Sequence, residues 1–247
     1  MKASLPQKAY NSIAGAYAAK IATKAQNTFF EREATLSLID CVDGKRILDA
    51  GCGPGVYTKW LLERGAQVIA FDANTKMLEY ARKLTANQAR FFHANMEEPL
   101  SFIDSGSMDG IVCALAITYV KDHKALFAEF NRVLHTHGWL VLSTEHPFFT
   151  YKYYKVPIYF RTKRVSSVWK GFGKPVLMPS YHHSLGSICE ALSENDFTIE
   201  MIIEPKPTKQ LKKANQKDYK KLMRFPLFLC IRAKKINNYM KVKSSDG

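Results

Sequence analysis

The stretch Arg46-Ile47-Leu48-Asp49-Ala50-Gly51-Cys52-Gly53-Pro54-Gly55-Val56-Tyr57-Thr58 decides the fold. Its first apolar residues follow a turn at Asp43-Gly44 and begin a short strand. Its three glycines form a loop in which the missing Cβ atoms allow positive φ and let a ligand approach the backbone. Apolar residues at 60–62 then indicate a helix. Strand, glycine loop and helix together favour a nucleotide-like ligand at the end of a parallel strand.

The loop residues narrow the choice of ligand. A phosphate-binding loop of the P-loop kind needs a Gly-Lys-Ser/Thr sequence, which is absent here. The dinucleotide fingerprint places a small residue three positions after its second glycine, where this chain has Val56. Asp49 precedes the loop, and its carboxylate would repel a pyrophosphate but can hold an ammonium group directly or through water. The loop therefore suits a nucleoside with a cationic end.

A second acid supports a nucleoside ligand. Gln67-Val68-Ile69-Ala70-Phe71-Asp72 has the pattern of a second strand that ends in a carboxylate. Asp72 follows Gly51 by 21 residues, where an acid at the neighbouring strand end can accept hydrogen bonds from both ribose hydroxyls.

Five markers stand in the order found in one enzyme family. To the glycine loop and Phe71-Asp72 the chain adds Asn95-Met96, Met108-Asp109-Gly110-Ile111-Val112, and Arg132-Val133-Leu134 followed by Gly138. With these residues the sequence resembles the class I S-adenosylmethionine-dependent methyltransferases, in particular the small-molecule, methyltransferase type 11-like group. The resemblance covers roughly residues 10–204. It implies an α/β fold: a Rossmann-like, seven-stranded, mostly parallel sheet with helices on both faces, an antiparallel last strand, N-terminal helices and a substrate-cap insertion.

The resemblance also implies a cofactor site. The cofactor would be S-adenosyl-L-methionine and the product S-adenosyl-L-homocysteine. Gly51, Gly53 and Asp49 would hold the methionine end, Asp72 the ribose, and Asn95 with Met96 the adenine. The family usually has Asp at position 95, and an Asn carbonyl can accept the same hydrogen bond. The full set of expected cofactor-binding residues is Tyr17, Asp49, Ala50, Gly51, Gly53, Asp72, Ala73, Met77, Asn95, Met96, Cys113 and Ala114.

The N-terminal tyrosines have two interpretations. Tyr10 and Tyr17 resemble the paired tyrosines of a family segment that lies over the cofactor pocket, and Tyr17 is the one expected to approach the methionine part. Alternatively, both rings only pack a helix onto the core.

The chain is expected to form a single methyltransferase domain over residues 1–247. An N-terminal helical cap would span 1–42, a substrate-cap insertion 148–183 and a polar tail 235–247. Periodicity predicts further helices over 75–84, 123–134 and 184–192, and a solvated helix or loop over 209–221. The remaining strands are expected at 90–96, 108–115, 139–143, 197–204 and 226–233.

Two histidines are candidate catalytic residues. His146 follows the fifth predicted strand and precedes Pro147, which places it at the carboxyl edge of the sheet, where ligands bind in such folds. It is a candidate substrate contact or general base, because the pKa of imidazole suits proton removal near neutrality. The alternative is a ring that only braces the loop. His182, in Tyr181-His182-His183-Ser184-Leu185, matches a family histidine. The adjacent pair lacks metal-ligand spacing, so no metal is expected.

Composition limits the location and the partners. The chain has 247 residues, with five widely spaced cysteines, no Cys-x-x-Cys, no secretory segment and no apolar run that could cross a bilayer, which favours the cytoplasm. Residues 1–150 carry a net charge of +1, 151–174 of +7, 175–205 of −5 and 206–247 of +11.

The basic segments leave the acceptor open. Aromatic and basic side chains interleave over residues 148–183, a pattern compatible with a lid or with nucleic-acid binding. A lid over a small-molecule substrate is the preferred interpretation, because the family that the sequence resembles places its substrate cap there. Methylation of nucleic acid or of a protein bound to it is an alternative. It is disfavoured because Ala114-Leu115-Ala116-Ile117 stands where such enzymes have an Asn-Pro-Pro-Tyr-like sequence. A non-catalytic cofactor-binding regulator is a further alternative, and the oligomeric state stays undetermined.

Overall fold

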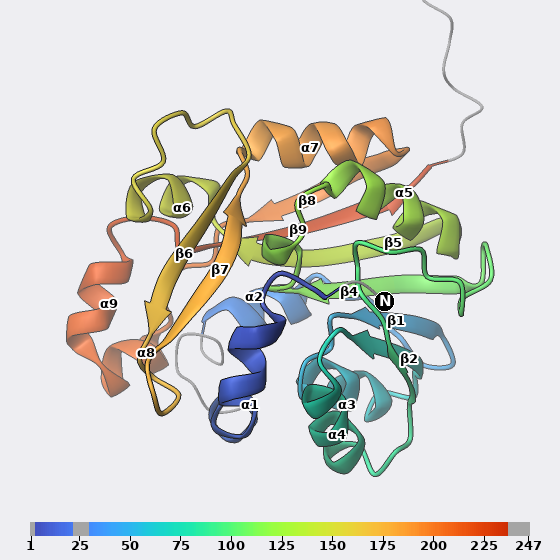
Figure 1. Cartoon of the computed structure of the whole chain (residues 1–247). Helices are drawn as coiled ribbons and strands as arrows, with labels where there is room; N and C mark the ends of the chain where they lie inside the picture. The colour runs from blue at the N-terminus through green and yellow to red at the C-terminus, as the bar shows by residue number, and fades with distance from the viewer. Residues whose placement is uncertain (1–2, 22–29, 237–247) are drawn as a thin grey trace, which may run out of the picture.

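A seven-stranded sheet forms the centre of the computed structural model, which describes residues 3–21 and 30–236 (Figure 1). The strand order is β3-β2-β1-β4-β5-β9-β8. Strands β1 to β5 pair in parallel, and β9 pairs antiparallel with both β5 and β8. The strands are β1 Arg46–Ala50, β2 Gln67–Asp72, β3 Arg90–His93, β4 Met108–Ala114, β5 Leu134–Glu145, β8 Phe197–Ile203 and β9 Phe228–Lys235. The predicted mostly parallel sheet with an antiparallel last strand is confirmed.

Helices cover both faces of this sheet (Figure 1). One apolar cluster joins the sheet to α5 and α7, and a second joins the opposite face to α3 and α4. The helices are α1 Gln7–Ile21, α2 Arg32–Ser37, α3 Val56–Leu62, α4 Thr75–Leu84, α5 His123–Val133, α6 Pro147–Tyr153, α7 Leu185–Glu194, α8 Lys209–Ala214 and α9 Gln216–Leu222, with a short 3₁₀ helix η2 at Ile117–Tyr119.

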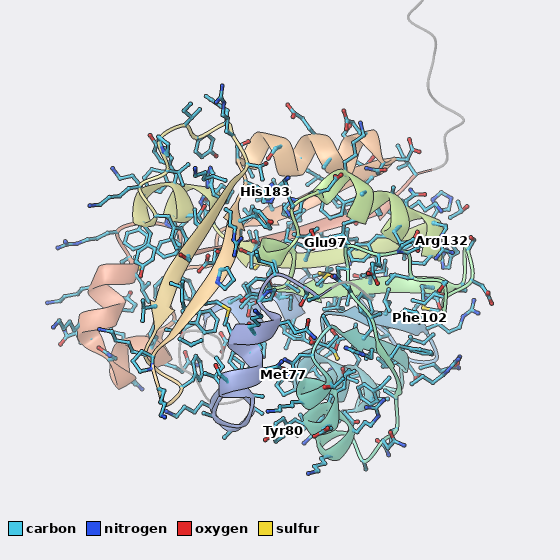
Figure 2. All side chains as sticks on the ribbon, in the orientation of Figure 1. Met77, Tyr80, Glu97, Phe102, Arg132 and His183 are labelled. Atoms are coloured by element: carbon cyan, nitrogen blue, oxygen red, sulfur yellow. The ribbon has the colours of Figure 1, made fainter. Side chains whose placement is uncertain are left out.

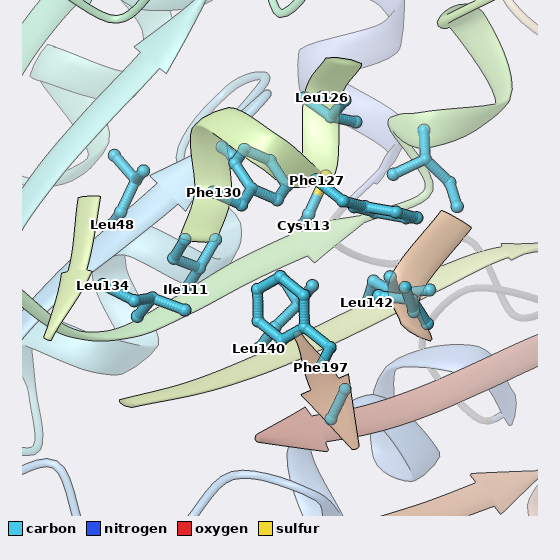
Figure 3. Packing of buried hydrophobic residues seen from close by; sticks show 14 of the residues in the cluster. Leu48, Ile111, Cys113, Leu126, Phe127, Phe130, Leu134, Leu140, Leu142 and Phe197 are labelled. Atoms are coloured by element: carbon cyan, nitrogen blue, oxygen red, sulfur yellow. The ribbon is translucent and has the colours of Figure 1, made fainter. Parts of the chain in front are cut away.

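Helix α5 shows how the apolar pattern becomes core. Its apolar residues recur at helical spacing, so Leu126, Phe127 and Phe130 all face the sheet and are at most 2% exposed. Figure 3 shows these side chains against Ile111 of β4 and Leu140 of β5. Both strands are apolar on the two faces because each face is covered by helices.

Strand β5 begins earlier than the sequence predicted. The expected helix to residue 134 and the strand from 139 are joined directly, because β5 starts at Leu134. Its pairing with β4 shifts register between Met108 and Gly110, which absorbs residues 135–138 as a bulge. His137 takes a φ of 67° within this bulge.

The insertion after β5 contains structure that the sequence did not predict. It begins with α6 and continues as an antiparallel hairpin of β6 Lys163–Trp169 and β7 Val176–His182. Figure 1 shows this hairpin apart from the main sheet and beside α1. Ala9 and Ile13 of α1 form a buried cluster with Phe172 of the hairpin loop and Met178 of β7.

The C-terminal basic segment also packs more closely than expected. Leu211 of α8 and Leu222 of α9 are buried with Phe30 and Phe228, so these short helices have an apolar side in addition to their charged one. Residues 22–29 of the expected N-terminal cap and 237–247 of the expected tail lie outside the described residues. No helix in the described part of the chain is long and apolar enough to cross a membrane.

Candidate active site

Two adjoining cavities lie where the carboxyl ends of the parallel strands meet, the edge at which open α/β sheets bind ligands. The first, here called the glycine-loop cavity, has about 740 Å³ of empty space including the open solvent at its mouth. It is lined by Ser4, Pro6, Gln7, Tyr10, Tyr17, Gly51, Gly53, Phe71, Asp72, Ala73, Asn74, Met77, Ala94, Asn95, Met96, Ala114, Leu115, Ala116, Tyr119 and Val120.

The glycine loop forms one wall of this cavity, and two of its glycines are required for different reasons. Gly51 has a φ of 73°, and a Cβ built there would lie 2.7 Å from Ala116 Cβ and 2.9 Å from Met96 Cε. Gly53 has a φ of 53°, and a Cβ there would meet nothing within 4 Å. Gly51 thus permits close packing of the cavity floor, whereas Gly53 presents its backbone to open space.

Asp72 lies opposite the loop at the end of β2. Its Oδ2 accepts a hydrogen bond from the Gly53 N–H at 2.9 Å, and its Oδ1 accepts one from the Asn74 N–H at 2.8 Å. Burial raises the pKa of this carboxyl above its ordinary value, while the two N–H donors oppose that shift. Each oxygen retains acceptor capacity toward the cavity, as a pair of ligand hydroxyls requires.

Asp49 lies behind the loop. It is 1% exposed and accepts a hydrogen bond from the Thr58 hydroxyl, which joins β1 to α3 beneath the glycines. Burial raises the pKa of Asp49 to about 7, with the charge of Asp72 adding to the shift and the Thr58 bond opposing it. Asp49 is a buried support of the loop in this structure, and its carboxylate does not line the cavity.

The wall formed by α4 and by the segment after β3 is more apolar than the glycine loop. Met77 at the first turn of α4 and Met96 after β3 both line it, and Figure 2 shows Met77 on the side of α4 that faces α1. Asn95 is 3% exposed, and its Oδ1 accepts a hydrogen bond from the Glu97 N–H at 3.1 Å. Above this wall, Asn74 Nδ2 donates to Asn11 Oδ1 of α1 at 2.8 Å, which holds α1 over the cavity.

The structure brings nine of the twelve expected cofactor-binding residues to this cavity: Tyr17, Gly51, Gly53, Asp72, Ala73, Met77, Asn95, Met96 and Ala114. Asp49, Ala50 and Cys113 are buried behind its wall. Sequence reasoning did not assign Gln7, Phe71, Asn74 or Ala94 to the site, although they line it, whereas it did expect the segment 116–120 to face the pocket. Most of these four residues adjoin the end of a strand, and that position is the sequence signal that could have identified them.

The second cavity, here called the aromatic cavity, lies between α1, the end of β5 and the hairpin. Its empty space is about 880 Å³. It is lined by Tyr10, Tyr17, Ile21, Leu115, Thr118, Tyr119, Glu145, Tyr154, Trp169, Met178, Ser180, Leu227 and Phe228.

Four residues line both cavities: Tyr10, Tyr17, Leu115 and Tyr119. Leu115 has a φ of 52°, in the left-handed region that a branched side chain rarely adopts. Its N–H donates to the Ser143 hydroxyl and carbonyl, each at 3.0 Å, which holds the chain in this conformation. Strained backbone of this kind gathers at functional sites, so the boundary between the cavities is the strongest candidate for the reacting position.

The tyrosines at this boundary form a connected wall. The Tyr10 and Tyr119 hydroxyls are hydrogen-bonded at 2.8 Å, and the Tyr17 ring stacks with Trp169 at 6.4 Å between centroids. Burial raises the pKa of Tyr17 to about 12, so its phenol stays neutral near pH 7. The pKa values of Tyr10 and Tyr119 are raised for the same reason.

Neither candidate catalytic histidine lines either cavity. His146 Nδ1 accepts the Phe148 N–H at 3.0 Å and caps α6, while its Nε2 lies 2.9 Å from Glu204 Oε1 without the alignment of a hydrogen bond. The preceding residue, Glu145, lines the aromatic cavity. Because successive residues of an extended chain point to opposite sides, Glu145 and His146 cannot both face that space.

His182 is enclosed within the insertion. It is fully buried, with Nδ1 bonded to the Thr150 hydroxyl at 2.7 Å and Nε2 bonded to the Tyr159 carbonyl at 2.8 Å. Both ring nitrogens are therefore engaged in holding α6 and the following loop to β7. Burial lowers the pKa of both histidines, His146 and His182. Among the described residues, no three or more His, Cys, Asp or Glu side chains gather where a metal ion could bind.

Comparison with known proteins agrees with this geometry. Residues 48–142, from β1 to β5, match the family described as "Methyltransferase domain". An uncharacterised protein of Haemophilus influenzae is 29% identical over 232 residues, which cover 85% of this chain and 89% of that protein. A malonyl-[acyl-carrier protein] O-methyltransferase of Hamiltonella defensa is 31% identical over 136 residues, covering 54% of this chain and 52% of that enzyme. This chain thus spans about half the length of that O-methyltransferase.

A solved structure extends the likeness to most of the chain. The S-adenosylmethionine-dependent methyltransferase of Mesorhizobium loti superposes with a TM-score of 0.68 at 28% identity, covering 87% of this chain and all of that one. The cavity has an acid at the end of β2 and a glycine loop after β1, and this arrangement fits the same cofactor. The chain belongs to the class I S-adenosylmethionine-dependent methyltransferases of the small-molecule type, and S-adenosyl-L-methionine is its cofactor.

Proposed function

We propose that this enzyme transfers the methyl group of S-adenosylmethionine to a small-molecule acceptor held in the aromatic cavity. One observation carries the proposal: the glycine-loop cavity and the aromatic cavity share a wall of four residues, with the strained Leu115 among them. A donor and an acceptor bound on the two sides would meet at that wall. Holding the reactants in this way supplies much of the catalysis of a transfer reaction.

The glycine-loop cavity offers a partner for each part of the cofactor. We assign the ribose hydroxyls to Asp72, which lines the cavity at the end of β2 and whose two oxygens each accept one backbone N–H. The methionine end is assigned to the backbone of Gly51 and Gly53, and the adenine to Asn95 and Met96. When bound, the cofactor supplies a methyl group activated by a positively charged sulfur, so the protein needs chiefly to align and to exclude water.

The cap would exclude water. Helix α1 covers the glycine-loop cavity, and the β6–β7 hairpin closes the far side of the aromatic cavity through Trp169, Met178 and Ser180. We therefore propose that residues 148–183 act as the substrate cap. The proposal leaves the methylated atom as N, O or C, because a relative whose name specifies its substrate matches only about half of this chain.

Replacement of Asp72 tests the cofactor assignment. Asp72→Ala removes a charged acceptor and leaves two partly buried N–H groups without their partner, so the affinity for S-adenosylhomocysteine should fall about 100-fold. Isothermal titration calorimetry measures this loss directly. Asp104→Ala, at an exposed acid outside both cavities, is the matched control and should bind normally.

A screen of metabolites for release of S-adenosylhomocysteine tests the transfer itself. The wild-type enzyme should release the product with at least one small acceptor, and Asp72→Ala should not do so at the same cofactor concentration. Unchanged cofactor affinity in Asp72→Ala would count against the ribose assignment. Turnover only with a nucleic acid would count against the small-molecule acceptor.

A further inference from the structure

The insertion after β5 presents a basic and apolar surface between α6 and β6, here called the insertion surface and formed by residues 152–164. We propose that this surface docks the enzyme onto an anionic lipid bilayer, with its cations among the headgroups and its apolar side chains inserted beneath them. Docking of this kind is a peripheral contact with one leaflet. It does not depend on the identity of the methyl acceptor.

The insertion surface carries positive charge without compensation. It has five basic side chains and no acidic one, and all five are exposed: Lys152, Lys155, Arg161, Lys163 and Arg164. None of the five forms an ion pair with another of the described residues. Along the chain, the nearest acids are Glu145 and Glu190. Each Lys or Arg held near an anionic bilayer strengthens attachment to it, so the segment favours a negatively charged partner.

The same segment exposes three large apolar side chains. Tyr153 is 57% exposed, Ile158 45% and Phe160 83%. Single exposed apolar residues are ordinary on protein surfaces, but these three lie within eight residues and are interspersed with cations. Apolar side chains beside Lys and Arg are the combination that binds at a lipid–water interface. Phe160 packs on little of its own protein, so most of its ring is free to enter an apolar layer.

The residue between two of these side chains fixes their outward orientation. Tyr159 is held from two sides: its carbonyl accepts a hydrogen bond from His182 Nε2 at 2.8 Å, and its hydroxyl accepts the Leu185 N–H at 3.1 Å. Ile158 and Phe160 flank this anchored tyrosine and are exposed, whereas Tyr159 is half-buried. The loop therefore presents its apolar side chains to the outside while its backbone is braced against β7 and α7.

A bilayer fits these features better than a protein or a nucleic acid does. A folded partner would need a pocket shaped for Phe160, whereas a fluid bilayer accepts a protruding ring without one. A nucleic acid would use the cations, but the aliphatic side chain of Ile158 cannot stack on a base or hydrogen-bond to it. Figure 1 shows α6 and the loop after it at an outer corner of the molecule, apart from the central sheet. A flat surface can reach them there.

The insertion surface adjoins the proposed acceptor site. An open groove at its edge is lined by Lys155, Lys163 and Arg164, which places the charges of the loop and of β6 next to one another. Tyr154 lines this groove and also the aromatic cavity. Docking would therefore bring the aromatic cavity close to the bilayer, where an acceptor with a lipid-soluble part can reach it. This consequence rests on the proposed function, whereas the docking itself does not.

Co-sedimentation with vesicles of defined composition tests the docking. The whole chain should bind vesicles in which about a third of the lipid is phosphatidylserine about tenfold more tightly than vesicles of phosphatidylcholine alone. Binding should weaken as NaCl is raised from about 0.1 M to about 0.5 M, because salt screens the attraction. No binding to the anionic vesicles, or equal binding to both kinds, would overturn the proposal.

Single charge variants locate the binding surface, because other basic segments of the chain also attract anionic lipid. Lys155→Gln and Lys163→Gln should each weaken binding to the anionic vesicles about fivefold. Lys83→Gln makes the same change at an exposed residue of α4, which Figure 1 shows far from α6, and it should bind as the wild type does. Equal losses in all three variants would indicate attraction by overall charge alone and would overturn the insertion surface.

Phe160 distinguishes insertion from attraction. Phe160→Ser removes a ring that is 83% exposed, so thermal unfolding should be unchanged while binding to the anionic vesicles weakens about tenfold. Leu84→Ser, at a residue of α4 that is 41% exposed, is the matched control and should keep full binding. Full binding by Phe160→Ser would mean that the apolar side chains stay outside the bilayer, contrary to the proposal.

Fluorescence quenching reports the depth of the same position. In Phe160→Trp the added indole should be quenched by anionic vesicles whose acyl chains carry bromine, because it lies among those chains. The wild type has three tryptophans, at positions 60, 139 and 169, and none of them is fully exposed, so the same vesicles should quench it much less. Equal quenching of the two proteins would count against insertion at residue 160.

Failure of docking differs from failure of the proposed function. Affinity for S-adenosylhomocysteine, measured without vesicles, should be the same in Lys155→Gln, Phe160→Ser and the wild type, because neither residue lines the glycine-loop cavity. If vesicle binding is absent while a soluble acceptor still releases S-adenosylhomocysteine, docking is overturned and the proposed function stands. If no small acceptor releases the product, the proposed function fails, and the vesicle measurements alone decide on docking.

Discussion

The two cavities share a wall but are built from the chain in different ways. The glycine-loop cavity draws mainly on segments that directly follow parallel strands: 51–53 after β1, 72–77 after β2, 94–96 after β3 and 114–120 after β4. The aromatic cavity combines α1, the end of β5, the hairpin and the approach to β9. The fold itself creates the first site, whereas the second depends on how a cap and an insertion pack against each other.

The difference extends to chemistry. The glycine-loop cavity contains backbone groups, the carboxylate of Asp72 and the amides of Gln7, Asn74 and Asn95, which suit a ligand with a defined set of hydrogen bonds. The aromatic cavity contains large rings around one carboxylate. Changes on the first side should therefore act on cofactor affinity and leave the acceptor preference intact. Changes on the second should do the opposite.

The largest expected effect tests whether the glycine loop serves the cofactor alone. Gly51→Ala places a methyl group 2.7 Å from Ala116 Cβ and 2.9 Å from Met96 Cε, at a φ of 73° that alanine tolerates poorly. The loop or the cavity floor must move, so affinity for S-adenosylhomocysteine should fall about 1,000-fold. Calorimetry measures the affinity, and thermal unfolding measures the cost in stability.

Gly106→Ala is the matched control for that experiment. Gly106 has a φ of 64°, close to that of Gly51, but a Cβ there meets nothing within 4 Å. It isolates the backbone cost, about 1–2 kcal/mol, from the steric clash. Equal losses of cofactor affinity in the two variants would show that the clash at Gly51 has no effect on the site.

The next expected effect is a dependence of protein stability on pH, which arises behind the glycine-loop cavity and not at the aromatic cavity. Burial raises the pKa of Asp49 to about 7 from an ordinary value of 3.8. The folded protein then holds a proton that the unfolded chain releases, so the free energy of unfolding falls as pH rises from about 4 to about 7 and levels off above. The tyrosines of the aromatic cavity have raised pKa values and stay neutral throughout this window.

Asp49→Asn should remove this dependence. The variant keeps an oxygen for the Thr58 hydroxyl and carries no charge, so it should match the wild type near pH 4 and exceed its stability near pH 8 by on the order of 4 kcal/mol. Urea unfolding at the two pH values measures the difference. The same loss of stability between them in Asp49→Asn as in the wild type would show that another group titrates.

The local sequence pattern was sufficient to predict the part of the site that is formed by strand ends. The glycine loop, Asp72 and Asn95-Met96 each follow a strand that is recognisable from its apolar run, so their meeting at one edge could be predicted. Asp49 lies on β1 and accepts the Thr58 hydroxyl under the loop, so its contact with the methionine end of the cofactor stays a prediction. Sequence spacing does not tell whether a side chain lies in front of a loop or behind it.

The aromatic cavity could not be predicted in the same way. The residues of β6 and β7 combine charged, apolar and aromatic side chains without clear alternation, because the hairpin is exposed along much of its length. Its strands are defined by pairing with each other and by packing of Phe172 and Met178 on α1. These contacts join residues far apart in the sequence. The aromatic composition of the insertion was visible, but not which rings would face the acceptor.

The prediction of His146 as a site residue shows the same limit at one position. His146 and the preceding Glu145 both lie at the carboxyl edge of β5, and imidazole is the more usual base near neutrality. The direction of each side chain depends on the parity of the strand, and β5 orients Glu145 toward the aromatic cavity and His146 toward Glu204. Register within the sheet, rather than residue type, decides which of the two can reach an acceptor.

The smallest expected effect tests whether His146 caps α6 rather than acting as a general base, and it uses a pair of variants at this position. Its ring accepts the Phe148 N–H and so caps α6, a role that Asn performs well and Ala cannot perform. His146→Ala should therefore lose about 1 kcal/mol of stability, while His146→Asn stays near the wild type. Turnover with the best acceptor should remain within about threefold in both variants, because neither cavity is lined by His146.

The pair separates two roles that a single alanine variant would confuse. If His146 were the general base, His146→Asn would be stable and yet slow, by the 100-fold or more that loss of a base costs in typical cases, about 10²–10⁴. If it acts as a cap, the loss of stability and any loss of turnover should appear together in His146→Ala and vanish in His146→Asn. Steady-state kinetics and urea unfolding on the same preparations measure both quantities.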